Sequence, residues 1–537
     1  MPIPIDDLKF PYADAAEIHE ADDKRLFATL FSVPQHIDRL IKSPIYFIIG
    51  EKGTGKTAIA TYVSNALNPQ LSGATVKVEK EDYDNFKSFN SSVPLTFADY
   101  SEIWETSLLL LLSANLIEAL EPSYRETLQY ANSVAAVLGR VNYGASVARL
   151  AESFDLLCWN RPALFEALAK EFPDRITGEI PVHFRTYVRV VKSILVLALN
   201  DVGLSRNSPN SKYLLFIDGV DTRPLMTGSS EGGITHEFQF SCLAGLIASV
   251  QRLNTQILRR NFGHNVRVVL LVRPDIMEKV NLHNAANIMN DNSILINWYT
   301  ANHDYETSEF FKLADYMLLQ QQPNRELYPM VGDCWRAYFP DSGLTFGDKI
   351  RDAFVVFLQH SFYRPRDLVF FLRSIRDRMD ALERGGATKF DLHLFTRQNA
   401  MGNYSNYLLN EIKDSTLFYH DETAFDLLVR LFSILHDDIK DGAFSYSNFV
   451  GAYNELRRES DPQLLMNSPI FSSADDFLQF LYEFNVIGFR MPPRDTGIFS
   501  FCYQRRSASM IRPRVRTKTE YRIHHGVGRA LYPKGIP

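Results

Sequence analysis

The chain has 537 residues, enough for about three structural units of roughly 150 residues each. Hydrophobic residues make up 46% of it and charged residues 22%, an ordinary globular composition with ample core material. The most apolar run, residues 108–112, is far shorter than the roughly 20 residues that span a bilayer, so no membrane span is expected. The first seven residues do not resemble a signal peptide, and the four scattered cysteines form no CxxC pair. We therefore expect a cytoplasmic protein without a zinc site or a disulfide framework.

The net charge of −6 is unevenly distributed. Residues 501–537 hold nine Lys and Arg against the single acid Glu520, a net charge of +8, which leaves −14 on residues 1–500. A basic end on an acidic body predicts either an anionic partner or an internal electrostatic contact between domains.

Residues 1–40 are expected to form an N-terminal segment, and the first motif follows at residues 45–58. A short apolar run, typical of a buried strand, leads into Gly-x4-Gly-Lys-Thr, and a helix-forming sequence continues after it. Strand, glycine-rich loop and helix in this order are typical of a phosphate-binding P-loop, although a glycine-rich turn could match by chance. The glycines let backbone N–H groups approach phosphate oxygens closely.

The motif assigns roles to its residues. Lys56 would reach the β- and γ-phosphates, where it would serve catalysis, and the Thr57 hydroxyl would ligate Mg²⁺. The positive end of the following helix would face the same anion. We therefore expect ATP and Mg²⁺ as cofactors, bound by Gly50, Glu51, Lys52, Gly53, Thr54, Gly55, Lys56, Thr57 and Ala58.

After an alternating strand at residues 74–79, residues 100–200 are largely helical. Helices are expected at 100–120, 126–138, 161–172 and 181–199. This run is longer than a strand–helix crossover needs, so we interpret it as a helical insertion. It is either a regulatory or partner-binding element or a plain structural elaboration.

The second nucleotide signature is the apolar run 213–217 followed by Asp218. Asp218 would end a buried parallel strand, where α/β sheets place ligands, and would hold Mg²⁺ through water unless it is only a turn residue. Asp221 could orient or deprotonate the attacking water. Many ATPases of this type carry a glutamate directly after the strand-end aspartate, but this chain has Gly219 there, so we expect hydrolysis that is slow or depends on Asp221.

Two further strands, at residues 266–272 and 293–298, would complete a five-stranded parallel core with helices on both faces. Arg273 follows the first of them and lies at the tip of the strand expected beside the Asp218 strand. It would either sense the γ-phosphate, as a catalytic residue, or form a surface salt bridge.

The core would thus span residues 41–300, and residues 301–385 would form a helical lid with helices at 307–321, 346–360 and 365–379. Arg364 and Arg366 stand at the start of the last helix. Either one could reach back to the γ-phosphate, so Arg366 is a candidate nucleotide ligand, or both could be ordinary exposed arginines.

Residues 386–537 are expected to form a winged-helix-like domain. Four helices, at 401–412, 421–436, 445–458 and 474–484, precede alternating strands at 486–491, 498–503 and 521–525. The Arg-rich stretch 505–522 would either bind DNA phosphates or be a solvated wing. His524 and His525 have no third ligand at metal-binding spacing, so we do not expect a metal there.

These motifs together resemble prokaryotic P-loop ATPases of the STAND, KAP and origin-recognition-like AAA+ group. They are the P-loop, Phe-Ile-Asp-Gly-Val-Asp, Leu-Val-Arg-Pro-Asp, Tyr-Arg-Pro-Arg-Asp-Leu and Val-Ile-Gly-Phe. The resemblance implies a switch in which ATP binding and slow turnover gate assembly or an effector, and relatives often occur beside genes of antiviral defence or DNA transactions. Residues 276–292 lack the arginine finger that AAA+ rings usually carry, so a finger-driven motor is not expected.

Two functions remain from this reasoning, and a nucleotide-binding protein that does not hydrolyse its nucleotide is a third, less favoured one. The preferred one is a nucleotide-gated switch or assembly ATPase, in antiviral defence, with a protein partner or effector and the option of homo-oligomer formation. The alternative is a DNA-processing ATPase that binds DNA through residues 505–522.

Overall fold

The computed structural model describes most of the chain. The described residues are 2–10, 21–31, 33–65, 67–78, 95–119, 192, 196, 212–221, 236–280, 290–301, 304–339, 344–346, 349–382, 384–396, 398–420, 422–460, 469–492, 498–506 and 513–532. The helices expected at 126–138 and 161–172, and nearly all of 181–199, lie outside these residues.

The chain divides into two compact units. The first unit holds Pro34–Gly50 and Lys56–Leu295, and the second holds Met1–Val33, Glu51–Gly55 and Ile296–Pro537. The P-loop is therefore shared between them. Its base belongs to the first unit and its tip, Glu51–Gly55, belongs to the second.

The first unit is built on a sheet of five parallel strands in the order β2-β3-β4-β1-β5. The strands are β1 (Phe47–Ile49), β2 (Leu71–Lys77), β3 (Lys212–Asp218), β4 (Val266–Val272) and β5 (Ser293–Leu295). Every residue of β1 and β4 is buried, as expected for apolar strands covered on both faces. The predicted parallel core is confirmed, and β4 separates the strand that carries Asp218 from the strand that leads into the P-loop.

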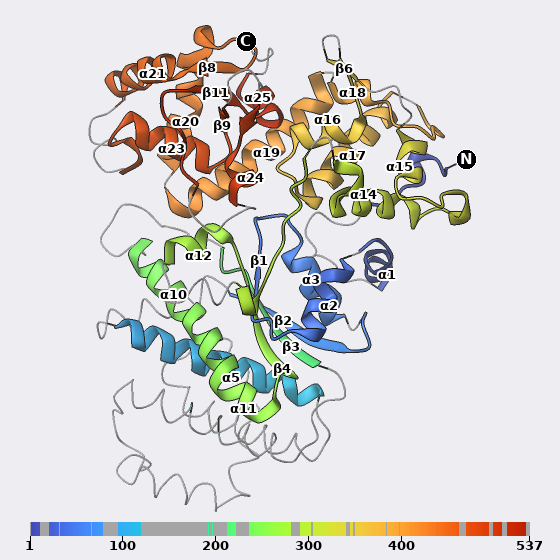
Figure 1. Cartoon of the computed structure of the whole chain (residues 1–537), viewed down its shortest axis with the longest axis vertical. Helices are drawn as coiled ribbons and strands as arrows, with labels where there is room; N and C mark the ends of the chain where they lie inside the picture. The colour runs from blue at the N-terminus through green and yellow to red at the C-terminus, as the bar shows by residue number, and fades with distance from the viewer. Residues whose placement is uncertain are drawn as a thin grey trace, which may run out of the picture. The chain divides into compact units, whose positions relative to one another are not determined.

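Helices cover both faces of this sheet (Figure 1). They are α2 (Pro34–Lys42), α3 (Lys56–Ser64), α5 (Phe97–Ala119), α10 (His236–Arg252), α11 (Arg259–Phe262) and α12 (Pro274–Val280), with a π-helical stretch, Leu253–Leu258, between α10 and α11. Helix α5 is the first helix expected in the insertion. It packs along α10, where Trp104 Nε1 donates to the Cys242 carbonyl oxygen over 3.0 Å.

The helices expected in the lid belong to the second unit. The elements here are α1 (Ala21–Leu30), α14 (Glu309–Leu319), α15 (Asp333–Tyr338), α16 (Ala353–His360) and α17 (Pro365–Asp380). The expected helix 346–360 starts later than predicted. A short hairpin, β6 (Leu344–Phe346) and β7 (Lys349–Arg351), precedes it, and α16 begins only where the Asp352 side chain caps it by accepting from the Phe354 N–H.

The C-terminal residues combine helices with a four-stranded antiparallel sheet in the order β10-β9-β11-β8. The elements are α18 (Leu392–Thr396), α19 (Gln398–Tyr419), α20 (Glu422–Leu435), β8 (Ala443–Ser445), α21 (Tyr446–Glu459), α23 (Ala474–Glu483), β9 (Ile487–Arg490), β10 (Phe499–Ser500), α24 (Cys502–Arg506), β11 (Glu520–Ile523) and α25 (His525–Leu531). The strand predicted at 498–503 is wrong beyond Ser500, because the chain turns into α24. There the Asn485 side chain accepts from the Tyr503 N–H over 2.8 Å.

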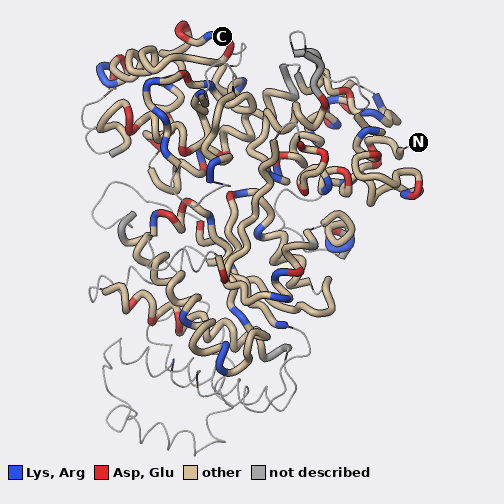
Figure 2. The backbone as a smooth tube through the Cα atoms, viewed as in Figure 1, with Lys and Arg blue, Asp and Glu red and all other residues tan. Residues whose placement is uncertain are grey.

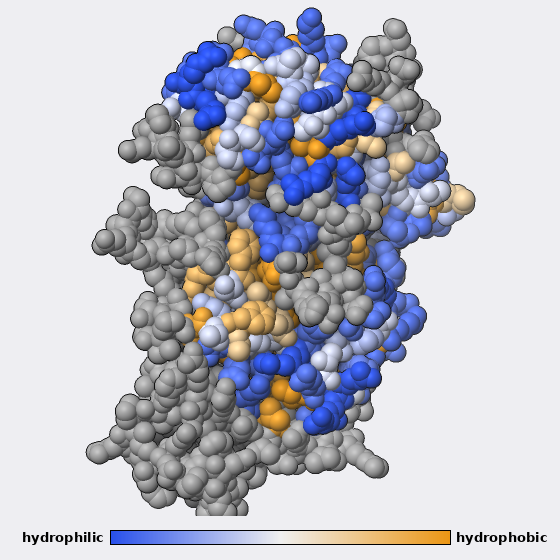
Figure 3. All heavy atoms as spheres, turned by 60° about the vertical axis from the view of Figure 1, so that its left-hand side comes forward, coloured by the Kyte–Doolittle hydropathy of each residue, from blue (hydrophilic) through white to orange (hydrophobic). Residues whose placement is uncertain are grey.

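Lys and Arg residues of this C-terminal part are interspersed with Asp and Glu (Figure 2). Its face in Figure 3 is mainly hydrophilic, with scattered apolar residues. Among the residues that the structure describes, no helix is both long and apolar enough to cross a membrane.

Candidate nucleotide-binding site

The base of the P-loop is tied to the sheet. The Gly50 N–H donates to the Val272 carbonyl oxygen at the end of β4 over 3.1 Å. Lys56 begins α3 and is only 8% exposed, and its Nζ donates to the Gly50 carbonyl oxygen over 2.8 Å. In the tip, Gly53 and Gly55 have φ angles of +83° and +102°, a region that glycine enters without the steric cost of a side chain. The two glycines therefore allow the tip to turn, and the Lys56 side chain lies against the base of the loop.

The two side chains predicted to hold Mg²⁺ lie in contact. Thr57 is in the first turn of α3, Asp218 is the last residue of β3, and the Thr57 hydroxyl donates to Asp218 Oδ2 over 2.7 Å. Asp218 Oδ1 accepts from the Gly219 N–H over 2.8 Å. One hydroxyl and one carboxylate suit Mg²⁺, which keeps several waters and takes further ligands from substrate phosphates. Thr57 and Asp218 would hold the ion, which would neutralise charge on those phosphates.

The turn after β3 contains Asp221, the other candidate acid. Gly219 has a φ of +79°, so a side chain such as glutamate would be strained at this position. Asp221 lies half-buried in the same turn. The backbone geometry therefore explains why a glycine, and not an acid, directly follows Asp218.

Arg273 lies where the sequence predicted, directly after β4, but it is buried and not a surface residue. Its guanidinium forms a two-pronged ion pair with Asp275, with Nε at 3.0 Å from Oδ1 and Nη2 bonded to Oδ2. Asp275 Oδ1 also accepts from the Ile276 N–H over 3.1 Å at the start of α12. A surface salt bridge is therefore ruled out as its role, and Asp275 fixes the direction of the guanidinium.

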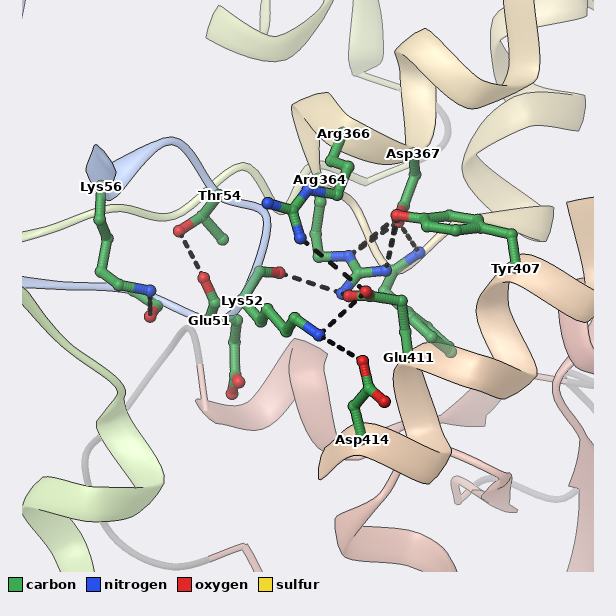
Figure 4. Close-up of polar contacts among 12 residues, drawn as sticks. Glu51, Lys52, Thr54, Lys56, Arg364, Arg366, Asp367, Tyr407, Glu411 and Asp414 are labelled. Atoms are coloured by element: carbon green, nitrogen blue, oxygen red, sulfur yellow. Dashed lines mark hydrogen bonds and ion pairs between the residues drawn. The ribbon is translucent and has the colours of Figure 1, made fainter. Parts of the chain in front are cut away.

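Charged side chains of the second unit hold the tip of the P-loop (Figure 4). Lys52 Nζ lies 2.9 Å from Asp414 and 3.1 Å from Glu411, both on α19. Glu51 lies 3.4 Å from Arg506, an 8% exposed residue of α24. The basic C-terminal stretch thus makes at least one internal contact of the kind that its charge suggested.

A buried ionic cluster lies behind this tip. Arg364 is bound to Asp367 through Nε and Nη2, at 3.0 and 2.6 Å, and lies 3.1 Å from Glu411. Asp367 also accepts from the Tyr407 hydroxyl over 3.0 Å. Burial by itself would raise the pKa of Glu411, but the charges of Arg364, Lys52 and Arg366 outweigh it and lower the pKa. Glu411 is therefore held in its charged form. Arg364 is not the exposed helix-start residue that one alternative predicted.

The candidate ligand Arg366 also belongs to the second unit. Its backbone N–H donates to the Gly53 carbonyl oxygen over 3.4 Å, and its guanidinium lies 3.8 Å from Glu411. A Cβ on Gly53 would lie 3.2 Å from the Arg366 Cβ, so the close approach of α17 favours glycine in the loop.

His524, the first of the two neighbouring histidines, caps a helix. His524 is the N-cap of α25, where its Nδ1 accepts from the Gly526 N–H over 3.2 Å. Its Nε2 faces the Ser361 carbonyl oxygen at 3.2 Å. Within the described residues, no three His, Cys, Asp or Glu side chains gather into a group that could hold a metal ion.

Sequence reasoning missed two residues that contact the loop or its supports. Trp298 was expected only as a strand residue, but β5 ends at Leu295 and the Trp298 indole Nε1 donates to the Thr54 carbonyl oxygen over 2.9 Å. Glu411 was expected only as part of a helix. Its position between the buried Leu408 and Ile412 was the one available signal, because an acid beside an apolar helix face usually has a buried partner.

Comparison of the chain with protein-family models gives no match, and comparison with curated protein sequences gives none either.

Proposed function

We propose that this chain is a P-loop ATPase that binds Mg²⁺-ATP and acts as a nucleotide-gated switch or assembly ATPase. The observation that carries the proposal is the 2.7 Å hydrogen bond between the Thr57 hydroxyl and the Asp218 carboxylate, which are 161 positions apart in the chain. If the glycine-rich turn matched the motif only by chance, its threonine would not be expected to contact a carboxylate at the end of another strand. The buried Lys56 at the start of α3 gives the site the cation that a polyphosphate needs.

The base is proposed to be adenine. The pattern Thr-Lys-x-Asp, which reads guanine in GTP-binding proteins, does occur once, at residues 388–391. There, however, Asp391 lies 2.6 Å from Arg384 and accepts from the His393 N–H over 3.0 Å at the start of α18. The tetrapeptide follows none of the five parallel strands, so its placement gives no support to guanine recognition.

Slow or partner-stimulated turnover follows from the turn after β3. Gly219 occupies the position at which many related ATPases carry a catalytic glutamate, and its φ of +79° disfavours any side chain there. The nearest acid along the chain is Asp221, which we propose as the group that orients the attacking water, with Arg273 near the γ-phosphate. A site with this composition suits a switch better than a fast motor.

The C-terminal residues are proposed to form a winged-helix-like domain behind a helical lid. The helices and strands follow in the order α20-β8-α21-α23-β9-β10-α24-β11, and β11 lies between β8 and β9 in the sheet, which supports this assignment. Helix α23 would then be the helix that enters a DNA groove. It carries Asp475 and Asp476 in its first turn, and all its residues from Phe477 to Glu483 are buried.

The burial of α23 and its acidic first turn favour a protein partner over DNA, because such a helix cannot readily approach phosphates. Arg514, Arg516 and Lys518 are exposed and would remain the DNA-binding residues of the alternative function. A cytosolic location, self-assembly and a role in antiviral defence are further proposals, and the last rests on the resemblance of the motifs alone.

The test measures ATP binding and turnover with Mg²⁺, with and without duplex DNA. Wild type is expected to bind ATP and to hydrolyse it slowly, without a response to DNA. Lys56→Ala should lose binding and Asp218→Asn should lose the dependence on Mg²⁺, while Asp221→Ala should bind ATP but lose turnover. Lys42→Ala is the matched control, because Lys42 is an exposed lysine of the same unit and its partner among the described residues is Asp38, also at the surface.

Two results would contradict the proposal. Failure of the wild type to bind any nucleoside triphosphate would remove the ATPase function altogether. Turnover that DNA stimulates several-fold, and that charge reversal at Arg514 and Arg516 abolishes, would replace the switch with the DNA-processing alternative.

A further inference from the structure

The carbonyl oxygens of the P-loop from Gly50 to Thr54 all accept hydrogen bonds. Within the loop, Lys56 Nζ donates to Gly50 over 2.8 Å, and the Thr54 hydroxyl donates to Glu51 over 2.8 Å. The next three carbonyls accept from outside the loop. The donors are Arg364 Nη1 to Lys52 at 3.0 Å, the Arg366 backbone N–H to Gly53 at 3.4 Å and Trp298 Nε1 to Thr54 at 2.9 Å. All three external donors belong to the second unit, as does the tip itself.

The direction of a carbonyl sets the direction of the next N–H. In a trans peptide the C=O and the following N–H lie in one plane and point in opposite directions. The bond from Arg364 to the Lys52 carbonyl therefore turns the Gly53 N–H to the other side of the loop, and the bond from Trp298 turns the Gly55 N–H in the same way. Backbone N–H groups that converge on one side of a loop form an anion-binding nest.

The donors are themselves held rigidly. Trp298 is 5% exposed and packs against Phe310, with ring centroids 5.6 Å apart. Arg364 is 6% exposed and is fixed by Asp367 and Glu411. The direction of each donor is therefore set by its own contacts within the second unit and not by the loop carbonyl that it binds.

We propose that Trp298 and Arg364 are positioning residues that turn the Thr54 and Lys52 carbonyls outward and so direct the Gly55 and Gly53 N–H groups toward the phosphates. The Thr54 N–H does not take part, because it donates to the Glu51 carbonyl oxygen over 3.3 Å. This inference rests on the proposed function, since it assumes that the P-loop binds a nucleotide. Its consequence is that ATP affinity should depend on Trp298 and Arg364.

The test replaces Trp298 by phenylalanine, which keeps a buried ring but removes the indole donor. Trp104→Phe is the matched control. Its indole is equally buried, at 4% exposure, and donates over 3.0 Å to the Cys242 carbonyl oxygen, which is not part of the loop. Isothermal titration with Mg²⁺-ATP should give a dissociation constant about five-fold higher for Trp298→Phe, the effect of one net hydrogen bond, and an unchanged one for Trp104→Phe.

Two further measurements separate positioning from general stability. Both variants should melt at similar temperatures, because each loses the same kind of buried hydrogen bond. ATP should change the tryptophan fluorescence of wild type and Trp104→Phe, but not that of Trp298→Phe, because the indole at the loop is the reporter.

A second variant, Glu411→Gln, loosens Arg364 and should weaken ATP binding about three-fold. Its control, Glu459→Gln, loses only the exposed pair with Arg430 and should leave binding unchanged.

The outcomes are distinct. If wild type binds ATP and both Trp298→Phe and Glu411→Gln bind it within two-fold of their controls, the positioning role is overturned while the proposed function stands. If wild type binds no ATP, both are overturned. If ATP binding weakens selectively in Trp298→Phe and its fluorescence response is lost, the inference is supported.

Discussion

Replacing Asp367 by asparagine should sharply destabilise the second unit. Asp367 is fully buried, and its two carboxylate oxygens accept from Phe362 N–H, from Tyr407 Oη and from two nitrogens of Arg364. Asparagine has nearly the same shape, but it loses the negative charge and turns one acceptor into an NH₂ donor that must face other donors.

The expected cost can be worked from these contacts. Breaking a buried ion pair by removing the charge of one partner costs about 3–5 kcal/mol. Glu411 remains 3.1 Å from Arg364 and keeps part of the compensation, so the lower end, about 3 kcal/mol, is expected. For a unit of this size that corresponds to a melting temperature lower by roughly 6–12 °C.

Differential scanning calorimetry is the assay, and Asp377→Asn is the control. Asp377 lies on the same helix and pairs with Arg376 at 3.2 Å, but its side chain is 66% exposed. An exposed pair contributes about 0–1 kcal/mol, so the control should melt close to wild type. If Asp367→Asn melts within about 2 °C of Asp377→Asn, which corresponds to less than 1 kcal/mol, the buried charge of Asp367 does not stabilise the unit.

Two further predictions concern other parts of the chain. Burial holds the pKa of His524 well below its usual value, so below about pH 6.5 the unfolded chain takes up a proton that the folded chain does not. Wild-type stability should therefore fall from pH 7 toward pH 5, and urea titrations of His524→Gln should show a shallower fall; parallel pH profiles would contradict the buried neutral imidazole. In strand β2, a Cβ on Gly73 would lie 2.1 Å from the Leu214 carbonyl oxygen, so Gly73→Ala should cost roughly 1–3 kcal/mol in the same assay. Gly451→Ala, where a Cβ meets nothing within 4 Å, should be neutral or slightly stabilising, and equal effects of the two substitutions would refute the steric argument.

The sequence alone determined the framework of the first unit. The P-loop, the apolar runs of β3 and β4 and the aspartate that ends β3 are local patterns, because burial on both faces and tight phosphate turns each impose their own residue types at fixed spacing. Parallel strands also end at one edge of a sheet, so the meeting of Thr57 with Asp218 could be predicted although 161 positions separate them. The sequence also shows directly that Gly219, and not an acid, follows Asp218.

Only the tertiary structure decided what surrounds the loop. Trp298 reaches Thr54 across 244 positions, Arg364 reaches Lys52 across 312 and Arg506 reaches Glu51 across 455. Such partners leave no periodic signal. Trp298 and Arg364 bind backbone carbonyls, which require a donor at the right place but no particular residue type in the loop, and Arg506 meets Glu51 only because distant segments pack together. Local spacing specifies elements and motifs, whereas the packing of distant segments specifies which donors hold them.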